Sequence, residues 1–569
     1  MARTLALVAA AASILQLAHA QCTPASTTQT YDYIVIGSGA GGIPVADKLS
    51  EAGKSVLLIE KGPPSSGRWN GTMKPSWLQG TNLTRFDVPG LFNQIWADPT
   101  GVSCEDIDVM GGCVLGGGVA VNSALWWKPH PRDFDLNFPS GWKTADMVNH
   151  TNTVFSRIPG TYIPSKDGKL YLQGGFDTVA KGLDASGFKQ LIPNDHADEK
   201  NFTYGHSTFF IENAERQGPL ATYLVTAAKR PSFTLWTNTV AKRVVRTGGH
   251  ITGVELECNK QGSVGPGTSG IVNVTPGTGR VILSAGTFGS AKLLMRSGIG
   301  PTDQLNVVKS SSTDGATMIS SDQWISLPVG NNLNDHVGTD IQIAHPDVVF
   351  YDFYGAWNNP IQSDKDLYLK NRSGILAQVA PNLGPIAWQQ IKGPDGGIRH
   401  IQWQSRVEGR TKNAMTITQY LGTGTTSRGR MTLQPNLNTR VSTVPYLRDA
   451  ADKDAVIQGI DFIRSALSKV NGLTWITPTS SQTTTAFVNS IPATVASRGS
   501  NHWIGSCTIG SDDGRTGGKA VVDLDTKVYG TDNLFVVDAS IFPGITTGNP
   551  SAAIVIVAER AAERILALK

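Results

Sequence analysis

The chain has 569 residues, which corresponds to about two to four domains of ordinary size. Hydrophobic residues make up 40% of it, and 13 Trp, 12 Tyr and 18 Phe supply enough apolar volume for a large core, so general disorder is excluded. The 49 basic and 45 acidic residues leave a net charge of +4 without any Lys/Arg-rich block, so the sequence predicts no nucleic-acid partner.

The first 20 residues have the pattern of a secretory signal peptide. Arg3 supplies the positive charge, residues 5–18 are mostly apolar, and residues 18–20 (Ala-His-Ala) fit a cleavage site. A membrane anchor is the alternative, but the apolar run is shorter than the roughly 18 residues that span a bilayer. We therefore expect a secreted, extracellular protein that begins at Gln21 and has no membrane association.

Cysteines and glycosylation acceptors agree with this location. Asn-x-Ser/Thr sequons occur at Asn70, Asn82, Asn149, Asn201, Asn273 and Asn371. Of the five cysteines, Cys104 and Cys113 are close enough in sequence to pair across a short loop, and the odd count leaves a free thiol or an intermolecular bridge. Neither a CxxC nor a zinc-type spacing is present, so we expect no metal site.

The first predicted elements form a complete βαβ unit. A strand over 31–36 enters the turn Gly37-Ser38-Gly39-Ala40-Gly41-Gly42, a helix follows that ends near Gly53, and a second strand over 55–59 closes on Glu60. A glycine-rich turn in an unrelated α/β fold is the alternative. The full set of strand, helix, strand and acidic end favours a dinucleotide site.

Each part of this unit has a physical task. Gly37 permits the tight turn, Gly39 lets the backbone approach a pyrophosphate, and Gly42 lets the helix pack against the strand. The helix N-terminus presents N–H groups to phosphate. The Glu60 carboxylate accepts hydrogen bonds from ribose hydroxyls and would repel a 2′-phosphate, which favours FAD or NAD over NADP.

Later segments of the chain also contain glycine-rich turns and strands that end near a glycine or a carboxylate. Residues 111–122 form a second glycine-rich stretch that ends at Asn122. A strand over 280–283 runs into a turn at Gly286 and a helix that stops before Gly300. A last strand ends at Asp538, and Gly548-Asn549-Pro550 precedes an amphipathic helix over 551–568.

With these motifs the sequence resembles the glucose–methanol–choline (GMC) oxidoreductases over essentially all of residues 31–569. The segment 329–336 (Val-Gly-Asn-Asn-Leu-Asn-Asp-His) adds to the likeness. Val119 and Ala291 depart from the family patterns, and we interpret both as tolerated packing changes.

Within the family, the sequence looks most like the flavin domain of cellobiose dehydrogenase. The likeness rests on residues 31–33, 86–92 and 500–503 and on Cys104 with Cys113. The haem domain of that enzyme is expected to be absent, because only about ten residues separate the predicted signal peptide from the first strand.

The resemblance implies an α/β fold, α+β overall, in which a Rossmann-like FAD-binding domain carries an inserted substrate domain built on an antiparallel sheet. We assign residues 31–130, 215–335 and 495–569 to the discontinuous FAD-binding domain. Residues 131–214 and 336–494 are assigned to the substrate-binding domain.

The predicted catalytic pair is His502 and Asn549. Oxidation of an alcohol needs a base for the hydroxyl proton, and histidine suits this task near neutral pH. The segment Ser500-Asn501-His502-Trp503 resembles the catalytic segment of the family, which places Asn549 beside the histidine. Asn549 also precedes a proline and a helix, so N-capping is the alternative structural role.

The remaining site assignments follow the resemblance. Cofactor contacts are expected from Gly37, Ser38, Gly39, Ala40, Gly41, Gly42, Glu60, Gly116, Gly117, Asn122, Val240, Ala285, Asp538, Ala539 and Pro550. Since residues 116–123 contain no His or Cys, we expect FAD to be bound non-covalently. Substrate contacts are expected from Asn93, Arg406 and Asn501, although Asn93 stands where the cellobiose-oxidising relatives have a glutamate.

These assignments predict oxidation of the anomeric carbon of glucose-ended mono- or oligosaccharides to lactones. His502 is the expected base, and an external acceptor such as a quinone or a redox protein takes the electrons. The resemblance favours a sugar dehydrogenase over an oxidase. A GMC alcohol or aryl-alcohol oxidase is the first alternative, and an FAD-containing lyase on the same fold is the second.

Overall fold

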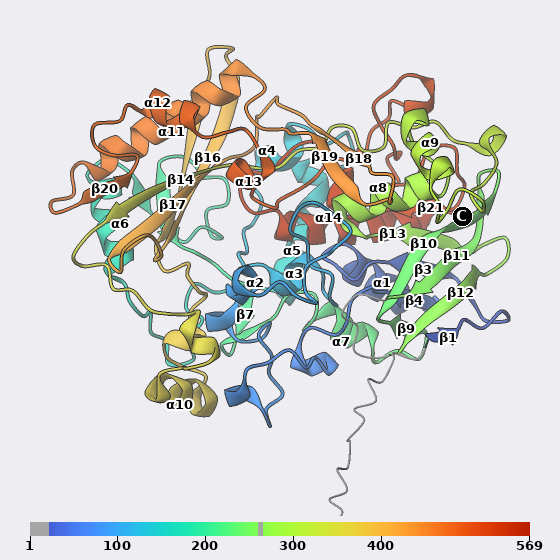
Figure 1. Cartoon of the computed structure of the whole chain (residues 1–569), viewed down its shortest axis with the longest axis horizontal. Helices are drawn as coiled ribbons and strands as arrows, with labels where there is room; N and C mark the ends of the chain where they lie inside the picture. Colours follow the sequence, from blue (N-terminus) through green and yellow to red (C-terminus); the bar gives the residue numbers. More distant parts are fainter. Residues whose placement is uncertain (1–21, 260–265) are drawn as a thin grey trace, which may run out of the picture.

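The computed structural model describes residues 22–259 and 266–569, so the predicted signal peptide at residues 1–20 lies outside the described residues. The molecule has two halves (Figure 1). One is built around a parallel sheet and the other around a larger, mostly antiparallel sheet.

The parallel sheet has five strands. In spatial order they are β21 (Leu534–Val536), β13 (Arg280–Leu283), β3 (Tyr33–Ile36), β4 (Val56–Ile59) and β9 (Phe233–Trp236). Every residue of β3 and β4 is buried, as expected for central parallel strands that are covered on both faces. The four strands predicted from 31–36, 55–59, 280–283 and 533–537 are confirmed.

A group of helices packs beside strands β3 and β4 of this sheet. α1 (Gly42–Glu51) contacts β3 and β4, and α7 (Tyr223–Ala227) and α14 (Ser551–Ala567) pack against α1. The carboxylate of Asp47 in α1 is fully buried and pairs with Arg157 at 2.7 Å and with Arg230 at 2.6 Å. Arg157 closes α5 (Thr144–Arg157), which also packs on α14. The predicted boundaries assign α5 to the substrate domain.

A second sheet lies beside the first, and its strands β10 and β11 contact β4 and β13. It consists of β1 (Cys22–Pro24), β12 (Gly267–Val274), β11 (His250–Cys258) and β10 (Thr239–Thr247), with β2 (Thr30–Tyr31) paired to β12. A disulfide joins Cys22 to Cys258 and so ties β1 to β11.

The other half carries a seven-stranded sheet. Its order is β20 (Thr474–Thr477), β14 (Val337–Ala344), β17 (Ala414–Leu421), β16 (Ile398–Arg406), β15 (Pro385–Lys392), β6 (Thr203–His206) and β5 (Lys189–Gln190). All neighbours are antiparallel except β5 and β6, which agrees with the predicted antiparallel sheet. α11 (Ala450–Leu467) and α6 (Gly174–Asp184) pack on it.

The remaining elements are short. Two ribbons pair β18 (Arg430–Leu433) with β19 (Thr439–Thr443) and β7 (Ile211–Glu212) with β8 (Glu215–Arg216). The other helices are α2 (Gln94–Ala97), α3 (Gly118–Val121), α4 (Pro131–Asp135), α8 (Gly286–Arg296), α9 (Thr302–Ser310), α10 (Gln362–Asn371), α12 (Thr484–Ser490) and α13 (Val495–Arg498).

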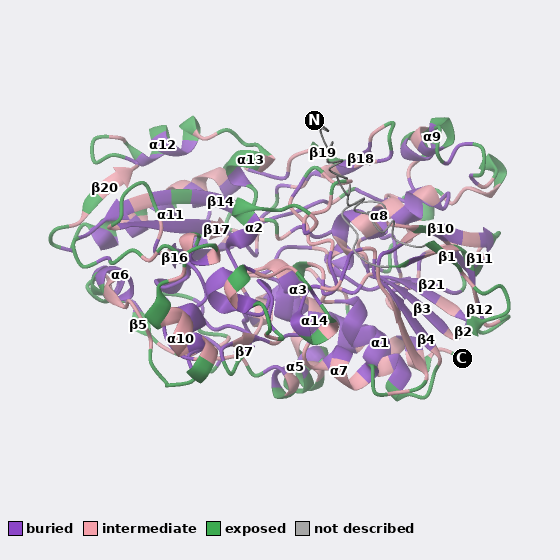
Figure 2. Cartoon of the chain, turned by 60° about the horizontal axis from the view of Figure 1, so that its bottom comes forward, coloured by how far each residue is buried: buried purple, intermediate pink, exposed green. Residues whose placement is uncertain are grey.

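One continuous apolar core runs through both halves. Buried residues fill the central strands and helices, while exposed residues lie on the outer loops (Figure 2). Among the residues that the structure describes, none of the helices combines the length and the apolar character needed to cross a bilayer. The mixed α/β architecture is confirmed.

Candidate active site

The site forms where the parallel strands end. Gly37 follows β3, Glu60 follows β4, and Asp538 lies two residues beyond β21. These residues line one cavity of about 500 Å³ that extends to His502, Asn549 and the seven-stranded sheet. The carboxyl edge of a parallel sheet is the usual place for a nucleotide, so the position of the cavity agrees with the prediction.

The glycine-rich turn after β3 is shaped for close approach of a phosphate. A methyl group built on Gly39 meets no atom within 4 Å, whereas one on Gly42 would lie 1.9 Å from the carbonyl oxygen of Gly37. Gly37 itself has φ +102°. Gly39 therefore faces open space and Gly42 packs inside the turn, as their predicted roles require. α1 begins without a side-chain cap, which suits an anion-binding helix N-terminus.

Hydrogen bonds from neighbouring residues fix the carboxylate of Glu60. Oε2 accepts hydrogen bonds from the backbone N–H and the hydroxyl of Ser38, at 3.1 and 2.6 Å, and Oε1 accepts from the backbone N–H of Gly62 at 2.8 Å. Burial raises the pKa of this carboxyl group. Glu60 thus fixes the turn in addition to lining the cavity.

Asp538 joins the ends of two strands. Its Oδ2 accepts from the backbone N–H of Gly286 at 2.9 Å and from the hydroxyl of Ser290 at 2.6 Å, both in α8. Its Oδ1 accepts from the backbone N–H of Ser540 at 2.8 Å. Asp538 therefore holds the N-terminus of α8 against the cavity, beside Ala285 and Ala539, which also line the cavity.

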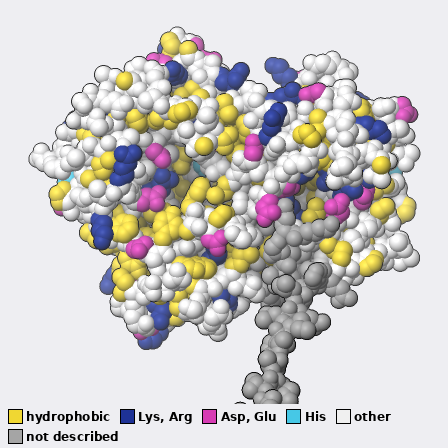
Figure 3. Space-filling model, in the orientation of Figure 1, with side chains coloured by type: hydrophobic (Ala, Val, Ile, Leu, Met, Phe, Trp, Pro, Cys, Tyr) yellow, Lys and Arg dark blue, Asp and Glu magenta, His cyan; other side chains and the backbone are white. Residues whose placement is uncertain are grey.

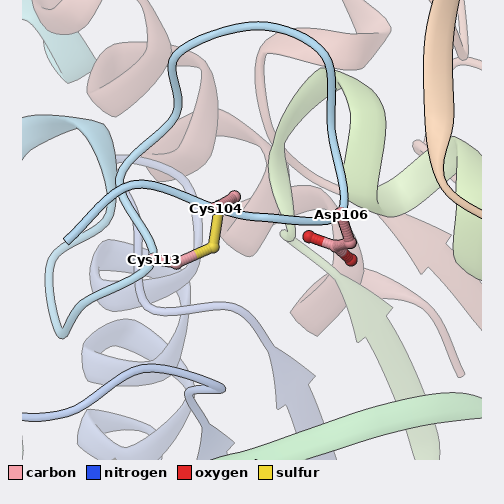
Figure 4. Close-up of side chains that lie close together, drawn as sticks. All are labelled: Cys104, Asp106 and Cys113. Carbon is pink, nitrogen blue, oxygen red and sulfur yellow. A yellow bond between two sulfur atoms is a disulfide. The ribbon is translucent and has the colours of Figure 1, made fainter. Parts of the chain in front are cut away.

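The predicted Cys104–Cys113 disulfide is confirmed (Figure 4). It closes a loop over the cavity, and Asp106 within the loop pairs with Lys61 at 2.6 Å and with Lys292 of α8 at 2.9 Å. The two ammonium groups hold the pKa of Asp106 below its usual range against the opposing effect of burial. The sulfur atoms of Cys104 and Cys113 lie near Asp106, but the disulfide leaves no thiolate to bind a metal.

Asn122 is oriented by a buried arginine that the sequence did not indicate. Arg216 donates to the side-chain oxygen of Asn122 at 3.0 Å and to its backbone oxygen at 2.6 Å. Burial lowers the pKa of Arg216 to about 9. Asn122 donates in turn to the hydroxyl of Ser551 at the start of α14, at 3.1 Å. This network joins the second glycine-rich segment to the helix that follows Asn549.

His502 and Asn549 meet at the inner end of the cavity. Nδ2 of Asn549 lies 3.0 Å from Nε2 of His502. The side-chain oxygen of Asn549 accepts from Nε1 of Trp127 at 3.0 Å and from Nε2 of Gln402 at 3.1 Å. Pro550 is the cap residue of α14, and no side-chain cap hydrogen bond is formed there. The alternative role of Asn549 as an N-cap is therefore not the one it adopts.

A second histidine lies behind His502. The Nδ1 atoms of His502 and His336 are 3.1 Å apart, and the rings meet edge to face with centroids 5.0 Å apart. Asp335 accepts hydrogen bonds from the backbone N–H groups of His502 and Ser500, both at 2.8 Å. The segment that carries the predicted base is thus fixed to the residues just before β14.

Burial dominates the electrostatics of this pair. It lowers the pKa of His502 well below 6.5, and the neighbouring His336 adds to the shift. Burial also lowers the pKa of His336 to about 4 and raises that of Asp335 to about 6. Both imidazoles are therefore neutral near pH 7, which leaves a free nitrogen lone pair for proton abstraction.

The predicted substrate residues lie along the same cavity. Asn93, Arg406 and Asn501 all line it. Arg406 contacts Glu408 at 3.0 Å and Asp340 at 3.7 Å. Trp126, Trp127 and Trp503 are buried, whereas Trp96 is 62% exposed and lines the cavity. Of the predicted cofactor residues only Gly42 and Gly116 do not line it.

Hydrophobic side chains gather on the half of the surface that carries α2 and α10 (Figure 3). In α2 and in the segment that precedes α10, the large exposed hydrophobic side chains are Trp96, Val349, Phe350, Tyr354 and Ile361. Trp96 and Tyr354 also line the cavity, so part of this apolar surface borders the site.

Sequence reasoning missed His336, Trp127 and Gln402 as parts of the site. His336 lies in the segment 329–336 that carried part of the resemblance, and this was the one available signal. The hydrogen bond of Trp127 to Asn549 depends on the fold, which brings together residues far apart in the sequence. Gln402 lies in the middle of β16, where no local pattern distinguishes it from other buried residues.

The chain matches known proteins over nearly its whole length. Two family models described as GMC oxidoreductase match residues 31–338 and 425–558. An oxygen-dependent choline dehydrogenase of Sinorhizobium fredii is 26% identical over 562 residues, which cover 94% of this chain and 95% of the relative.

Solved structures share the fold. An Aspergillus oryzae formate oxidase variant, studied for its FAD modification, has a TM-score of 0.74 at 19% identity and covers 95% of this chain and 99% of its own. A fungal aryl-alcohol oxidase has a TM-score of 0.69 at 18% identity, with 94% and 99% covered. The predicted family is confirmed: the chain belongs to the GMC oxidoreductases and is an FAD-dependent oxidoreductase.

Proposed function

We propose that the protein is a secreted sugar dehydrogenase. It oxidises the anomeric carbon of glucose-ended mono- or oligosaccharides to lactones and passes the electrons to an external acceptor such as a quinone. The resemblance to the flavin domain of cellobiose dehydrogenase motivates this proposal.

The observation that carries it is a group of uncharged polar side chains in the cavity. Asn93, Asn382 and Gln404 are buried and line the cavity. Nε2 of Gln404 donates to Ser207 and to the side-chain oxygen of Asn382, both at 3.2 Å. Within the described residues, the side-chain oxygens of Asn93 and Gln404 and the Nδ2 of Asn382 have no hydrogen-bond partner.

Unpaired buried polar atoms are costly, at about 1–3 kcal/mol each. A ligand with several hydroxyl groups can both donate to the two oxygens and accept from the amide nitrogen. A sugar therefore fits this lining better than an apolar alcohol does.

Arg406 also lines the cavity and suits a sugar substrate. Its guanidinium lies 3.0 Å from Glu408 and 3.7 Å from Asp340, so the two carboxylates compensate its charge. A sugar hydroxyl can accept a hydrogen bond from this guanidinium.

The residues of the chain can perform the proton chemistry. FAD, when bound, accepts the hydrogen of the carbinol carbon together with its two bonding electrons. His502, neutral and partly buried, takes the hydroxyl proton on Nε2. The amide of Asn549 orients the hydroxyl group next to this nitrogen.

A second candidate is an aryl-alcohol oxidase. Phe92, Trp96 and Tyr354 line one wall of the cavity and offer aromatic faces to a benzylic ring. One of the similar structures is an aryl-alcohol oxidase.

A substrate panel tests the two candidates. Purified holoenzyme is assayed with cellobiose, glucose, choline, formate and benzyl alcohol, once with a quinone and once with dioxygen as acceptor. The proposal expects the highest kcat/KM for a glucose-ended sugar, with turnover faster on the quinone. A preference for benzyl alcohol with dioxygen would establish the second candidate instead. Failure of every compound to reduce the flavin without oxygen would reject both and point to a lyase.

Secretion is a separate part of the proposal. The predicted cleavage after residue 20 and the sequons support it, and Asn70, Asn82, Asn149, Asn201 and Asn371 are exposed. Amino-terminal sequencing of protein collected from the culture medium should begin at Gln21. Retention of the intact chain inside the cells would contradict this part without affecting the chemistry.

A further inference from the structure

We propose that His336 is a positioning residue for the base. It accepts a hydrogen bond from Nδ1 of His502 and thereby fixes the tautomer in which Nε2 is unprotonated and can take the substrate proton in place of its hydrogen bond from Asn549. This inference rests on the proposed function of His502 as the base, but it does not depend on which alcohol is oxidised.

The first end of the hydrogen-bond chain is fixed by a backbone carbonyl. Nε2 of His336 lies 2.8 Å from the carbonyl oxygen of Thr546. A carbonyl oxygen can only accept, so the proton of His336 must be on Nε2. His336 is fully buried and its pKa is lowered to about 4, so near pH 7 the ring is neutral and its Nδ1 carries a lone pair.

The second end is fixed by two donors. Nε1 of Trp127 can only donate, and it lies 3.0 Å from the side-chain oxygen of Asn549. Gln402 donates to the same oxygen at 3.1 Å. The amide of Asn549 is therefore oriented with its NH₂ group towards His502.

His502 lies between these two ends and has one consistent protonation state. Its Nδ1 is 3.1 Å from the unprotonated Nδ1 of His336, so His502 must donate there. Its Nε2 is 3.0 Å from the NH₂ group of Asn549, so it must accept there. Two independent constraints thus place the lone pair of the base on the nitrogen next to Asn549, which lines the cavity.

The arrangement also serves the protonated state. As the alcohol gives its hydroxyl proton to Nε2 of His502, bound FAD would take the carbinol hydrogen with two electrons, and the carbinol carbon would become a carbonyl. The positive charge that forms on His502 is stabilised by the Nδ1–H hydrogen bond to His336, because a bond from a charged donor is stronger than one from a neutral donor.

Other titratable groups surround the pair. The carboxylate of Asp335 accepts one hydrogen bond from the backbone N–H of His502 and another, at 2.9 Å, from the hydroxyl of Tyr446. The ring of Tyr420 lies 5.6 Å from that of His502 and 5.9 Å from that of His336. Burial raises the pKa of Tyr420, Arg406 lowers it and Asp340 raises it further. Among these described neighbours, only His336 contacts Nδ1 of His502.

Two substitutions separate positioning from mere packing. His336→Leu fills similar space but cannot accept a hydrogen bond. His336→Gln keeps an oxygen that can accept from His502 and an NH₂ group that can donate to Thr546. The matched control is His345→Leu, because His345 is also buried and bonds a backbone carbonyl, that of Asn471 at 2.9 Å, at the far end of β14.

The measurement is the rate of flavin reduction by the best substrate of the panel, in holoenzyme and without oxygen, across pH. His336→Leu should lower the rate about 10²-fold, within the range contributed by a positioned base. It should also shift the acid limb of the pH profile, because the hydrogen bond and the charge of His336 both act on the protonation of His502. His336→Gln should recover most of the rate, and His345→Leu should resemble the wild type. A wild-type rate and pH profile in His336→Leu would overturn the inference.

A spectroscopic measurement covers the case in which His336→Leu fails to fold or to retain FAD. Nitrogen NMR of wild-type holoenzyme labelled at histidine, assigned with a His502→Gln variant, should show His502 protonated on Nδ1 and unprotonated on Nε2. The opposite tautomer would overturn the inference. This result is independent of the substrate, so failure of the sugar proposal and failure of this inference can be told apart.

Discussion

At the scale of single residues, His502 differs from a histidine held by a carboxylate. Its Nδ1 meets the neutral ring of His336, and its side chain is partly buried. A carboxylate partner would raise the pKa of the base. Here desolvation prevails, so the base stays neutral over the whole physiological range at some cost in basicity.

The activity should depend on pH through the protonation of His502. Only neutral His502 can accept a proton, and burial lowers its pKa below 6.5. Activity should therefore be complete above pH 6.5 and be lost only as the pH falls through the lowered pKa. A profile of kcat/KM between pH 4 and 8 checks this. A half-maximal point at or above pH 6.5 would show that the base is not desolvated as the structure indicates.

Among the structural elements, the turn between β3 and α1 contains two glycines with different roles, Gly42 and Gly39. Gly42 is required by the fold itself, because a methyl group there would lie 1.9 Å from the carbonyl oxygen of Gly37. Gly39 has room for a methyl group on the cavity side. That room is useful only if a ligand occupies it.

The second prediction compares Gly39→Ala with Gly42→Ala. The apoprotein of Gly39→Ala should unfold at the wild-type temperature and yet bind FAD at least tenfold more weakly, since the methyl group enters the space of the pyrophosphate. Gly42→Ala should lower the unfolding temperature even without FAD. Titration of each apoprotein with FAD and thermal unfolding provide the data. Unchanged FAD affinity in Gly39→Ala would mean that the dinucleotide does not approach this turn.

At the scale of the whole molecule, buried ion pairs connect segments that are far apart in sequence. Asp47 in α1 joins Arg157 of α5 and Arg230, which follows α7. The carboxylate is fully buried, whereas each arginine is about a quarter exposed, at 23% and 24%. Loss of the carboxylate would leave two arginines without their partner in a largely buried setting.

The third prediction is that Asp47→Asn destabilises the protein by about 3 kcal/mol, near the lower end for breaking a buried pair because the arginines are partly exposed. Thermal unfolding of the holoenzyme should show a drop of several degrees. Asp347→Asn is the control, since its pairing with Lys181 is exposed on both sides and is worth little. Equal unfolding temperatures for the two variants would contradict the assigned role of Asp47.

Much of the parallel half could be predicted from the sequence. The strands β3, β4, β13 and β21 are short apolar runs next to glycines or carboxylates, and local patterns of this kind identify nucleotide-binding edges. His502 and Asn549 were also predicted, through motifs beside them, and the structure brings the two side chains together. The Cys104–Cys113 disulfide was predictable because the two residues are near each other in the chain.

Other features depend on contacts that no local pattern carries. The Cys22–Cys258 disulfide joins residues 236 positions apart. The contact of His336 with His502 spans 166 positions and arises because the 500–504 segment pairs with the residues before β14. Gln402 and Trp127 meet Asn549 only when the two halves are assembled. These residues contact the predicted catalytic groups, so the sequence predicts the base but not the residues that surround it.

The proposed chemistry requires His502 to remove the substrate proton next to FAD. Its most direct test is the rate of flavin bleaching when wild-type and His502→Ala holoenzymes are mixed with the best substrate in the absence of oxygen. Both proteins should be yellow with similar flavin spectra, and the variant should be reduced about 10²- to 10⁴-fold more slowly. Reduction of His502→Ala at the wild-type rate would contradict this role of His502.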